Sequence, residues 1–233
     1  MPAYLHMLDW QLRLKANNPL DKPTEYDAAV AWLKGRGKTA KTITDQDREE
    51  FIAYVFGQYY KIVSAAIRKY DPHHLYVGSR VHARDTQFSN VALWRVMGRY
   101  LDVISVNDYF VWGPDPQEDP RWESWSHKPI LISEWYAKGR NVPDMGDTGG
   151  AGWIVKTQED RGKYFHHYML KCFESGNIVG SQYFTYMERK GSTLNNGLMN
   201  AACEPYTPFV DRVRAVNQQV YSLIDFFDHR KGN

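Results

Sequence analysis

Apolar side chains recur at helical spacing along several stretches of the chain. From residue 45 to residue 70 they return every three or four positions, which predicts a helix. The helix would begin at the acidic residues Asp45 and Asp47 and end at Asp71-Pro72. The same spacing predicts further helices over residues 91–100, 157–174 and 206–227.

Short apolar runs bounded by turn residues lie between these helices and predict strands. The predicted strands cover residues 75–81, 102–109, 129–135 and 178–186. A loop rich in Gly and Pro over residues 138–152 follows the third strand. A loop of that length favours a functional role over a simple connection.

Alternation of strands and helices predicts an α/β fold with parallel strands. Four successive strand–helix units are half of a (β/α)8 barrel, which in full takes about 250 residues. We therefore expect a TIM-barrel type fold of which only the C-terminal half is present. Residues 44–233 would form this half-barrel, and residues 1–43 an N-terminal segment leading into it.

Composition excludes several classes of partner. The chain of 233 residues is 43% hydrophobic and 24% charged, with a formal net charge of +2. We therefore expect neither nucleic acid nor a membrane as partner. Cys172 and Cys203 show no metal-ligand spacing, and we expect no metal and no cofactor. The N-terminus lacks a secretory signal, so either the protein is cytoplasmic or the chain begins inside its gene.

Aromatic content stands out at 15%, with 8 Trp and 16 Tyr. Part of this set belongs in the core. The rest can provide flat platforms with an apolar face and a polar edge, which suits sugar rings.

Polar and aromatic side chains gather where the predicted strands end. In chain order they are Arg80, His82, Asn107, Asp108, Tyr109, Glu134, Trp135, Tyr183, Tyr186 and Glu188. Reacting groups of βα barrels collect at this end of the strands. Glu134 is the leading catalytic candidate, because an unpaired carboxylate after an apolar strand is costly to bury. The alternative is that Glu134 pairs structurally with Arg80 or faces solvent.

Five ordered segments carry a resemblance to a known family. They are 66–80, 102–109, Ile132-Ser133-Glu134-Trp135, Thr157-Gln158-x-x-Arg161, and Gly180-x-x-Tyr183-Phe184-x-Tyr186 followed by Asn196-Gly197-Leu198. Over residues 45–227 the chain resembles the C-terminal half of a clan A retaining glycoside hydrolase, most closely the β-agarase type. The strand-eight pair Gln182-Tyr183 departs from the His-Trp of that pattern.

The resemblance implies roles for the strand-end residues. Glu134 would be the nucleophile, and Tyr109 would donate a hydrogen bond that favours its ionised form. Arg80 and His82 would orient Glu134 or bind sugar hydroxyls, although His82 could equally be a loop residue without such a role. Asn107 matches the Asn-x-Tyr strand end of the family and is a further substrate-binding candidate.

Aromatic candidates complete the expected substrate site. Trp135 and Tyr183 would form the stacking floor of the cleaved sugar's subsite. Trp112 and Trp153 would hold further rings, or alternatively plug the barrel end. Glu188 is also a substrate-binding candidate, although the adjacent Arg189-Lys190 favours a surface role.

The general acid/base of the family, the Glu of an Asn-Glu pair ending strand four, has no counterpart in this sequence. We favour a truncated or split chain that lacks this residue. Two alternatives are a subunit whose barrel is completed by a second chain or copy, and a smaller domain in which residues 1–43 replace the missing strands.

Hydrolysis of a β-linked polysaccharide by a retaining mechanism is the leading functional hypothesis. A non-catalytic carbohydrate-binding or assembly module is the alternative. A metal-dependent hydrolase ranks third, because the pairs His73-His74 and His166-His167 are adjacent and do not face one ligand together.

Overall fold

The computed structural model describes residues 6–17, 24–82, 89–115, 119–142, 145 and 149–231. The chain divides into two compact units. The helical unit comprises Met1–Gly78 and Asp85–Asp102, and the sheet unit comprises Ser79–Arg84 and Val103–Asn233.

Helices build the described part of the helical unit: α1 (Met7–Asn17), α2 (Thr24–Gly35), α3 (Asp45–Tyr70) and α4 (Val91–Tyr100). Leu8, Ala29, Leu33 and Phe51 are buried together in a core contributed by α1, α2 and α3. Apolar side chains at these positions explain why α1 and α2 pack against α3, which the sequence pattern did not reveal.

The start of α3 is stabilised by a capping box. The Thr44 side chain accepts from the backbone N–H of Asp47, and the Asp47 carboxylate accepts from the backbone N–H of Thr44. Lys38 adds an ion pair to the same carboxylate. The helix ends at Asp71 as its capping residue, so the predicted helix over residues 45–70 is confirmed.

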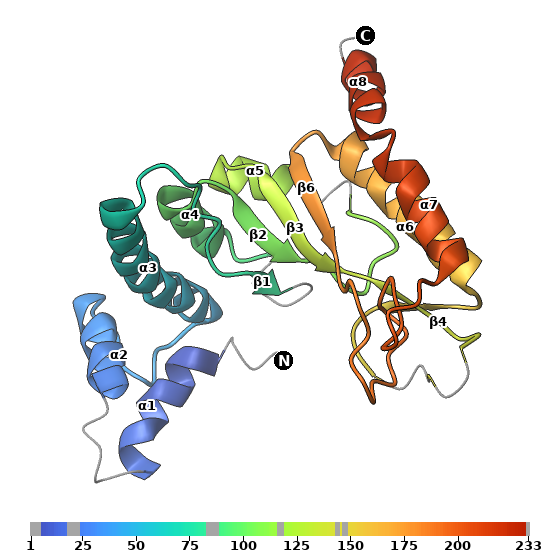
Figure 1. The fold of residues 1–233 in the computed structure, drawn as a ribbon. Coiled ribbons are helices and arrows are strands. Elements are labelled where there is room, and N and C mark those ends of the chain that lie inside the picture. The colour runs from blue at the N-terminus through green and yellow to red at the C-terminus, as the bar shows by residue number, and fades with distance from the viewer. Residues whose placement is uncertain are drawn as a thin grey trace. The chain divides into compact units, whose positions relative to one another are not determined.

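A four-stranded parallel sheet forms the centre of the sheet unit (Figure 1). Its order is β1 (Val81–His82), β2 (Ile104–Asn107), β3 (Ile130–Trp135) and β6 (Ile178–Tyr183). The helices of this unit are α5 (Asp119–Ser126), α6 (Gln158–Ser175), α7 (Thr207–Asn217) and α8 (Val220–Lys231). Neighbouring parallel strands that follow one another in the sequence are the arrangement of part of a (β/α)8 barrel, as the sequence predicts.

The helix layer packs on β3 and β6 through aromatic side chains. The Trp135 ring stacks on Tyr168 of α6, with centroids 3.8 Å apart and planes 8° apart. Phe165 of α6 contacts Phe209 of α7 at 6.2 Å between centroids. In Figure 1, α6 and α7 lie side by side next to β6.

Three predicted elements are wrong in extent. The strand predicted over 75–81 is reduced to β1, because the backbone of Tyr76 bonds to Asp102 and Gly78 takes a positive φ of 72°. The helix predicted over 206–227 is interrupted at Gln218-Gln219 and forms α7 and α8. The predicted loop over 138–152 begins within β4 (Ala137–Gly139), which pairs with β5 (Trp153–Val155) in a second, parallel sheet.

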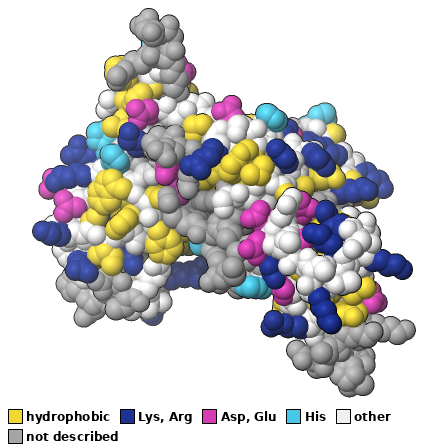
Figure 2. Space-filling model, turned by 180° about the vertical axis from the view of Figure 1, so that it is seen from behind, with side chains coloured by type: hydrophobic (Ala, Val, Ile, Leu, Met, Phe, Trp, Pro, Cys, Tyr) yellow, Lys and Arg dark blue, Asp and Glu magenta, His cyan; other side chains and the backbone are white. Residues whose placement is uncertain are grey.

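Side chains of both charges lie on the face of the molecule drawn in Figure 2. On the face drawn in Figure 2, basic side chains are spread among acidic and apolar ones. Within the described part of the chain, every helix is too short or too polar to cross a membrane.

Candidate active site

Glu134 lies near the C-terminal end of β3, where three side chains donate to its carboxylate. Arg80 Nη1 bonds to Oε1. Asn107 Nδ2 and Tyr109 Oη bond to Oε2 at 2.9 Å and 2.6 Å. The structure therefore brings together four of the residues that the sequence singled out: Arg80 just before β1, Asn107 and Tyr109 at and after the end of β2, and Glu134 near the end of β3.

Strand register explains this meeting point. Asn107 pairs with Glu134 across β2 and β3, after a register shift between Val106 and Asn107. Arg80 immediately precedes β1, which pairs with β2 through His82 and Asn107. Because the strands are parallel, their C-terminal ends reach the same edge of the sheet.

Glu134 remains accessible in spite of its partners. Its side chain is 16% exposed, and that of Arg80 is 53% exposed. A purely structural role of Glu134 would require its ion pair with Arg80, and this pair is present. Two uncharged donors, Asn107 and Tyr109, also bond to the carboxylate. A carboxylate held at both oxygens at a strand end, and still open to solvent, has a defined orientation toward a bound molecule.

Tyr109 is a permanent donor in this cluster. Its side chain is buried, and burial raises its pKa well above the ordinary value, with the hydrogen bond to Glu134 adding to the effect. The hydroxyl therefore stays protonated through the neutral range. Its ring lies near those of His82 and Tyr136, at centroid distances of 5.7 Å and 5.3 Å, so His82 is adjacent to the cluster.

Asp108 points away from Glu134, as strand alternation predicts. It is buried and accepts a hydrogen bond from Tyr168 Oη at 2.8 Å. This contact ties the end of β2 to α6. Asp108 is therefore a support of the site and not a second carboxylate within it.

Trp112 and Trp153 form an exposed aromatic pair. Their ring centroids are 6.1 Å apart, edge to face, and the residues are 48% and 42% exposed. Trp112 also packs edge-on against Tyr164 of α6 at 4.9 Å. Exposed apolar side chains that lie together in this way mark a candidate ligand-binding surface.

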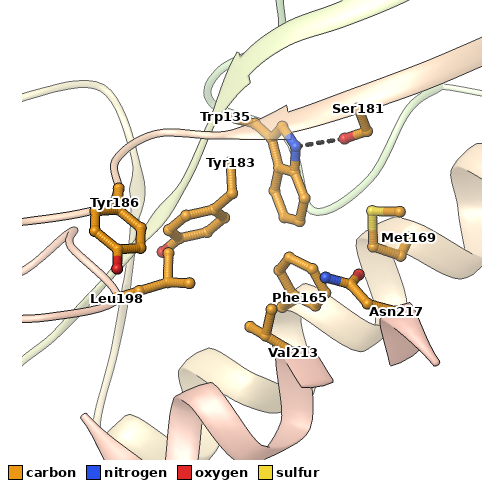
Figure 3. A pocket seen from close by; sticks show the side chains of 9 residues that line it. All are labelled: Trp135, Phe165, Met169, Ser181, Tyr183, Tyr186, Leu198, Val213 and Asn217. Carbon is orange, nitrogen blue, oxygen red and sulfur yellow. Dashed lines mark hydrogen bonds between the residues drawn. The ribbon is translucent and has the colours of Figure 1, made fainter. Parts of the chain in front are cut away.

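Trp135 and Tyr183 do not form the expected stacking floor. Both rings line a pocket of about 230 Å³ together with side chains of β6, α6 and α7, and Figure 3 shows how they lie in it. Trp135 is fully buried and donates through Nε1 to Ser181 Oγ at 2.6 Å. The Tyr183 hydroxyl accepts from Arg161 Nη2 at 3.0 Å. The expectation fails because Trp135 follows Glu134 on β3 and therefore faces the opposite side of the sheet, and Tyr183 pairs with Trp135 across β3 and β6.

Glu188 is neither on the surface nor open to a substrate. It is 2% exposed and accepts from Asn195 Nδ2 at 3.2 Å and from the backbone N–H of Gly197 at 3.0 Å. Burial raises its pKa, while these donors and the charge of Arg161 lower it, and the balance is a raised pKa. The surface role that the adjacent Arg189-Lys190 favoured for Glu188 is therefore wrong.

Arg161 is a buried residue to which the sequence pattern assigns no role of its own. It is fully buried and donates to Gln158 and Asn195 as well as to the backbone oxygens of Ala137 and Gly197. Its place in the segment Thr157-Gln158-x-x-Arg161 was the only signal. This cluster joins β4, α6 and the loop after β6.

Side chains able to hold a metal ion are dispersed in the described part of the chain. No group of three or more His, Cys, Asp or Glu suited to an ion is found among those residues. His74, from one of the adjacent histidine pairs, contacts Asp71 through Nδ1 at 2.7 Å. This contact joins two neighbours at the end of α3.

Comparison with known proteins places these features in a wider context. No family model matches the chain. Beta-agarase B of Vibrio sp. (strain JT0107) is 26% identical over 191 residues, which is 76% of this chain and 19% of that protein. Beta-agarase A of the same organism is 26% identical over 186 residues, 74% of this chain and 18% of that protein. The chain thus spans about a fifth of the length of these relatives.

Solved structures are similar over more of the chain. The crystal structure of BpGH50 has 32% sequence identity and a TM-score of 0.85, covering 95% of this chain and 47% of that one. The match to an exo-beta-agarase has 23% identity and a TM-score of 0.69, and it covers 93% of this chain and 30% of the exo-beta-agarase chain. The match to the agarase AgWH50C has 23% identity and a TM-score of 0.70, and it covers 92% of this chain and 32% of the AgWH50C chain. These last two similarities concern the fold. In sequence and in fold, the chain resembles part of a β-agarase-like glycoside hydrolase.

Proposed function

We propose that this chain carries the nucleophile of a retaining glycoside hydrolase that acts on a β-linked, agarose-type polysaccharide. The observation that carries the proposal is the carboxylate of Glu134 near the end of β3, which accepts hydrogen bonds from Arg80, Asn107 and Tyr109 on the two neighbouring segments of the sheet. The similarity to Beta-agarase B supports the substrate class.

In the proposed mechanism Glu134 attacks the anomeric carbon of the bound sugar. A bond forms between a carboxylate oxygen and this carbon while the glycosidic C–O bond breaks, and the leaving oxygen takes a proton from an acid. Water then cleaves the glycosyl-enzyme with overall retention. Arg80, Asn107 and Tyr109 keep the carboxylate oriented for both steps, and His82, adjacent to them, would contact a sugar hydroxyl.

The proton donor of the first step comes, in this proposal, from outside the 233 residues. Retaining enzymes hold their two carboxyl groups about 5–5.5 Å apart, and the described strand ends offer Glu134 alone, since Asp108 and Glu188 are turned away and buried. A second chain that adds strands at the edges β1 and β6 would supply the donor.

A mechanism-based label tests the nucleophile without the missing acid. A 2-fluoro glycoside with a dinitrophenyl leaving group needs no proton donor, because dinitrophenolate leaves unassisted. Mass spectrometry is expected to find the adduct on the peptide containing Glu134, and Glu134→Gln should remain unlabelled. The variant Glu188→Gln, at a buried carboxylate in the loop after β6, should still be labelled. An adduct elsewhere, or none, would contradict the assignment of the nucleophile.

A carbohydrate-binding module without catalysis is the second candidate. The exposed pair Trp112 and Trp153 favours it, because the rings would retain a sugar whether or not the bond is cleaved. It predicts oligosaccharide binding that is unchanged in Glu134→Gln, with no adduct in the labelling experiment. Reducing-sugar release that disappears in Glu134→Gln would exclude this candidate.

A further inference from the structure

Phe110 follows directly after the Asn107–Tyr109 strand end and has an unusual backbone. Its φ is 61°, in the left-handed region. A bulky aromatic residue is rare there and carries a conformational cost. Phe110 is nevertheless 57% exposed, so burial of its ring offsets little of that conformational cost.

An apolar hollow of about 290 Å³ opens beside the Phe110 ring. It is lined by Phe110, Gly152, Trp153 and Ile154. Among the described residues the lining contains no charged side chain. Trp153 and Ile154 are 42% and 37% exposed, so two aromatic rings and one aliphatic side chain face a space near the lower limit of small-molecule sites, about 300 Å³.

The glycine in this lining is required by packing. A Cβ atom at Gly152 would lie 2.2 Å from Cδ2 of Tyr136 and 2.6 Å from its backbone oxygen. The backbone N–H of Ala151 also donates to the Tyr136 hydroxyl at 2.8 Å. The second wall of the hollow is therefore held against Tyr136 by close contacts.

Both walls are connected to the Glu134 carboxylate. Phe110 adjoins Tyr109, whose hydroxyl donates to Glu134. Trp153 pairs with Ala137, three residues after Glu134. The rings of Tyr109 and Tyr136 are 5.3 Å apart and join the two walls. Residues on both walls of the hollow are thus linked to the proposed nucleophile through Tyr109 and Tyr136.

We propose that this hollow is a subsite that takes the C–H face of one neutral pyranose ring, stacked on Phe110 and Trp153. The strained backbone of Phe110 is retained because it presents the ring to that sugar. The inference rests on the proposed function and adds a neutral, unsulfated sugar unit as its ligand. The uncharged lining favours such a ring over an anionic one, since none of the described lining residues is a cation that could pair with an acid group.

The variant Phe110→Asn separates a binding role from a structural one. Asn adopts left-handed φ readily, so the melting temperature should stay the same or rise. Affinity for a soluble agarose-derived hexasaccharide, measured by calorimetry in a Glu134→Gln background that prevents turnover, should fall about tenfold, as for the loss of an aromatic stacking contact. A lower melting temperature with unchanged affinity would overturn the proposal.

Two further variants complete the test. Trp153→Ala should weaken hexasaccharide binding by a similar factor. Tyr221→Ala removes an aromatic residue that is 85% exposed on α8 and should change neither affinity nor melting temperature. No measurable binding to the unsubstituted chain would also overturn the proposal. If Phe110→Asn weakens binding but the 2-fluoro label never reaches Glu134, the hydrolase proposal fails and the subsite stands.

Discussion

The Glu134 carboxylate depends on single donor atoms from neighbouring segments of the sheet unit. Tyr109 contacts Oε2 at 2.6 Å. Asn107 shares that oxygen from the end of β2. Hydrogen bonds to a charged group are stronger than those between neutral groups. Loss of one donor should therefore lower the rate of the reaction at Glu134.

We expect Tyr109→Phe to slow 2-fluoro labelling of Glu134. The change removes the hydroxyl and keeps a ring to pack against Tyr136. A hydrogen bond to a charged group contributes about 1.5–3 kcal/mol, so the labelling rate should fall roughly 10- to 100-fold. Tyr168→Phe is the control, since its hydroxyl bonds to Asp108 on the other side of the sheet. It should lower the melting temperature and leave the labelling rate unchanged.

Asp47 makes the stability of the helical unit depend on pH. Burial alone would raise its pKa, but hydrogen bonds from Lys38 and Thr44 outweigh burial and lower the pKa from 3.8 to about 2. A carboxyl group with a lowered folded pKa stabilises the fold at pH values above its unfolded pKa. That contribution should be lost as the pH falls from about 4 to about 2.

The variant Lys38→Met tests this dependence. Its melting temperature, followed by circular dichroism, should lie below that of the unsubstituted chain at pH 6. The difference should shrink between pH 4 and pH 2 as Asp47 becomes protonated. A difference that is constant over this range would show that the pair does not contribute through its charge.

At the scale of elements, the segment leading into β5 is shaped by its contact with Tyr136. Gly150 has a φ of 75°, and the space beside Gly152 is filled by the Tyr136 ring. Gly149 differs, because a Cβ atom added there would lie 3.7 Å from its nearest neighbour, a methyl carbon of Leu194. Glycines in one segment thus have different physical requirements.

Gly152→Ala should destabilise the sheet unit, because the added methyl group meets both the ring and the backbone of Tyr136. Overpacking of this kind costs about 1–3 kcal/mol, measurable by urea unfolding. Gly149→Ala should change the free energy of unfolding much less. Equal effects of the two substitutions would show that the close approach to Tyr136 is relieved at no cost.

Elements with a strong local signal could be predicted from the sequence. The helix over 45–70 has both a capping box and helical periodicity, and the apolar run that precedes Glu134 does form a strand. The strand over 75–81 failed because Tyr76 bonds to Asp102, a distant partner that periodicity does not reveal. Likewise, the buried Glu188 carboxylate accepts hydrogen bonds from Asn195 and Gly197. These contacts form only when the loop is folded, so the sequence pattern does not reveal them.

At the scale of the whole molecule, the described sheet is open. Strand β6 lies at one edge with the sequence Ile-Val-Gly-Ser-Gln-Tyr, which contains neither Pro nor a charged residue. Val179 is 62% exposed on this strand. Edges without such protection pair readily with other strands, so we expect the isolated chain to associate through β6.

Val179→Lys should shift the chain toward the monomer in analytical ultracentrifugation, because a charge on an edge strand opposes pairing. Val179→Thr keeps the β-branched shape without the charge and should leave the distribution nearly unchanged. If both variants associate as the unsubstituted chain does, the contact between copies lies elsewhere.

The stacking of Trp135 on Tyr168 has a consequence for any attempt to redesign this protein. Trp135 anchors the sheet to α6, and the residue before it is the proposed nucleophile. Repacking the helix layer at Trp135 would turn the same short piece of backbone that aims Glu134. Stability and chemistry therefore cannot be optimised independently at these two positions, and a stabilising change is better sought in α1 or α2, whose residues take no part in the carboxylate cluster.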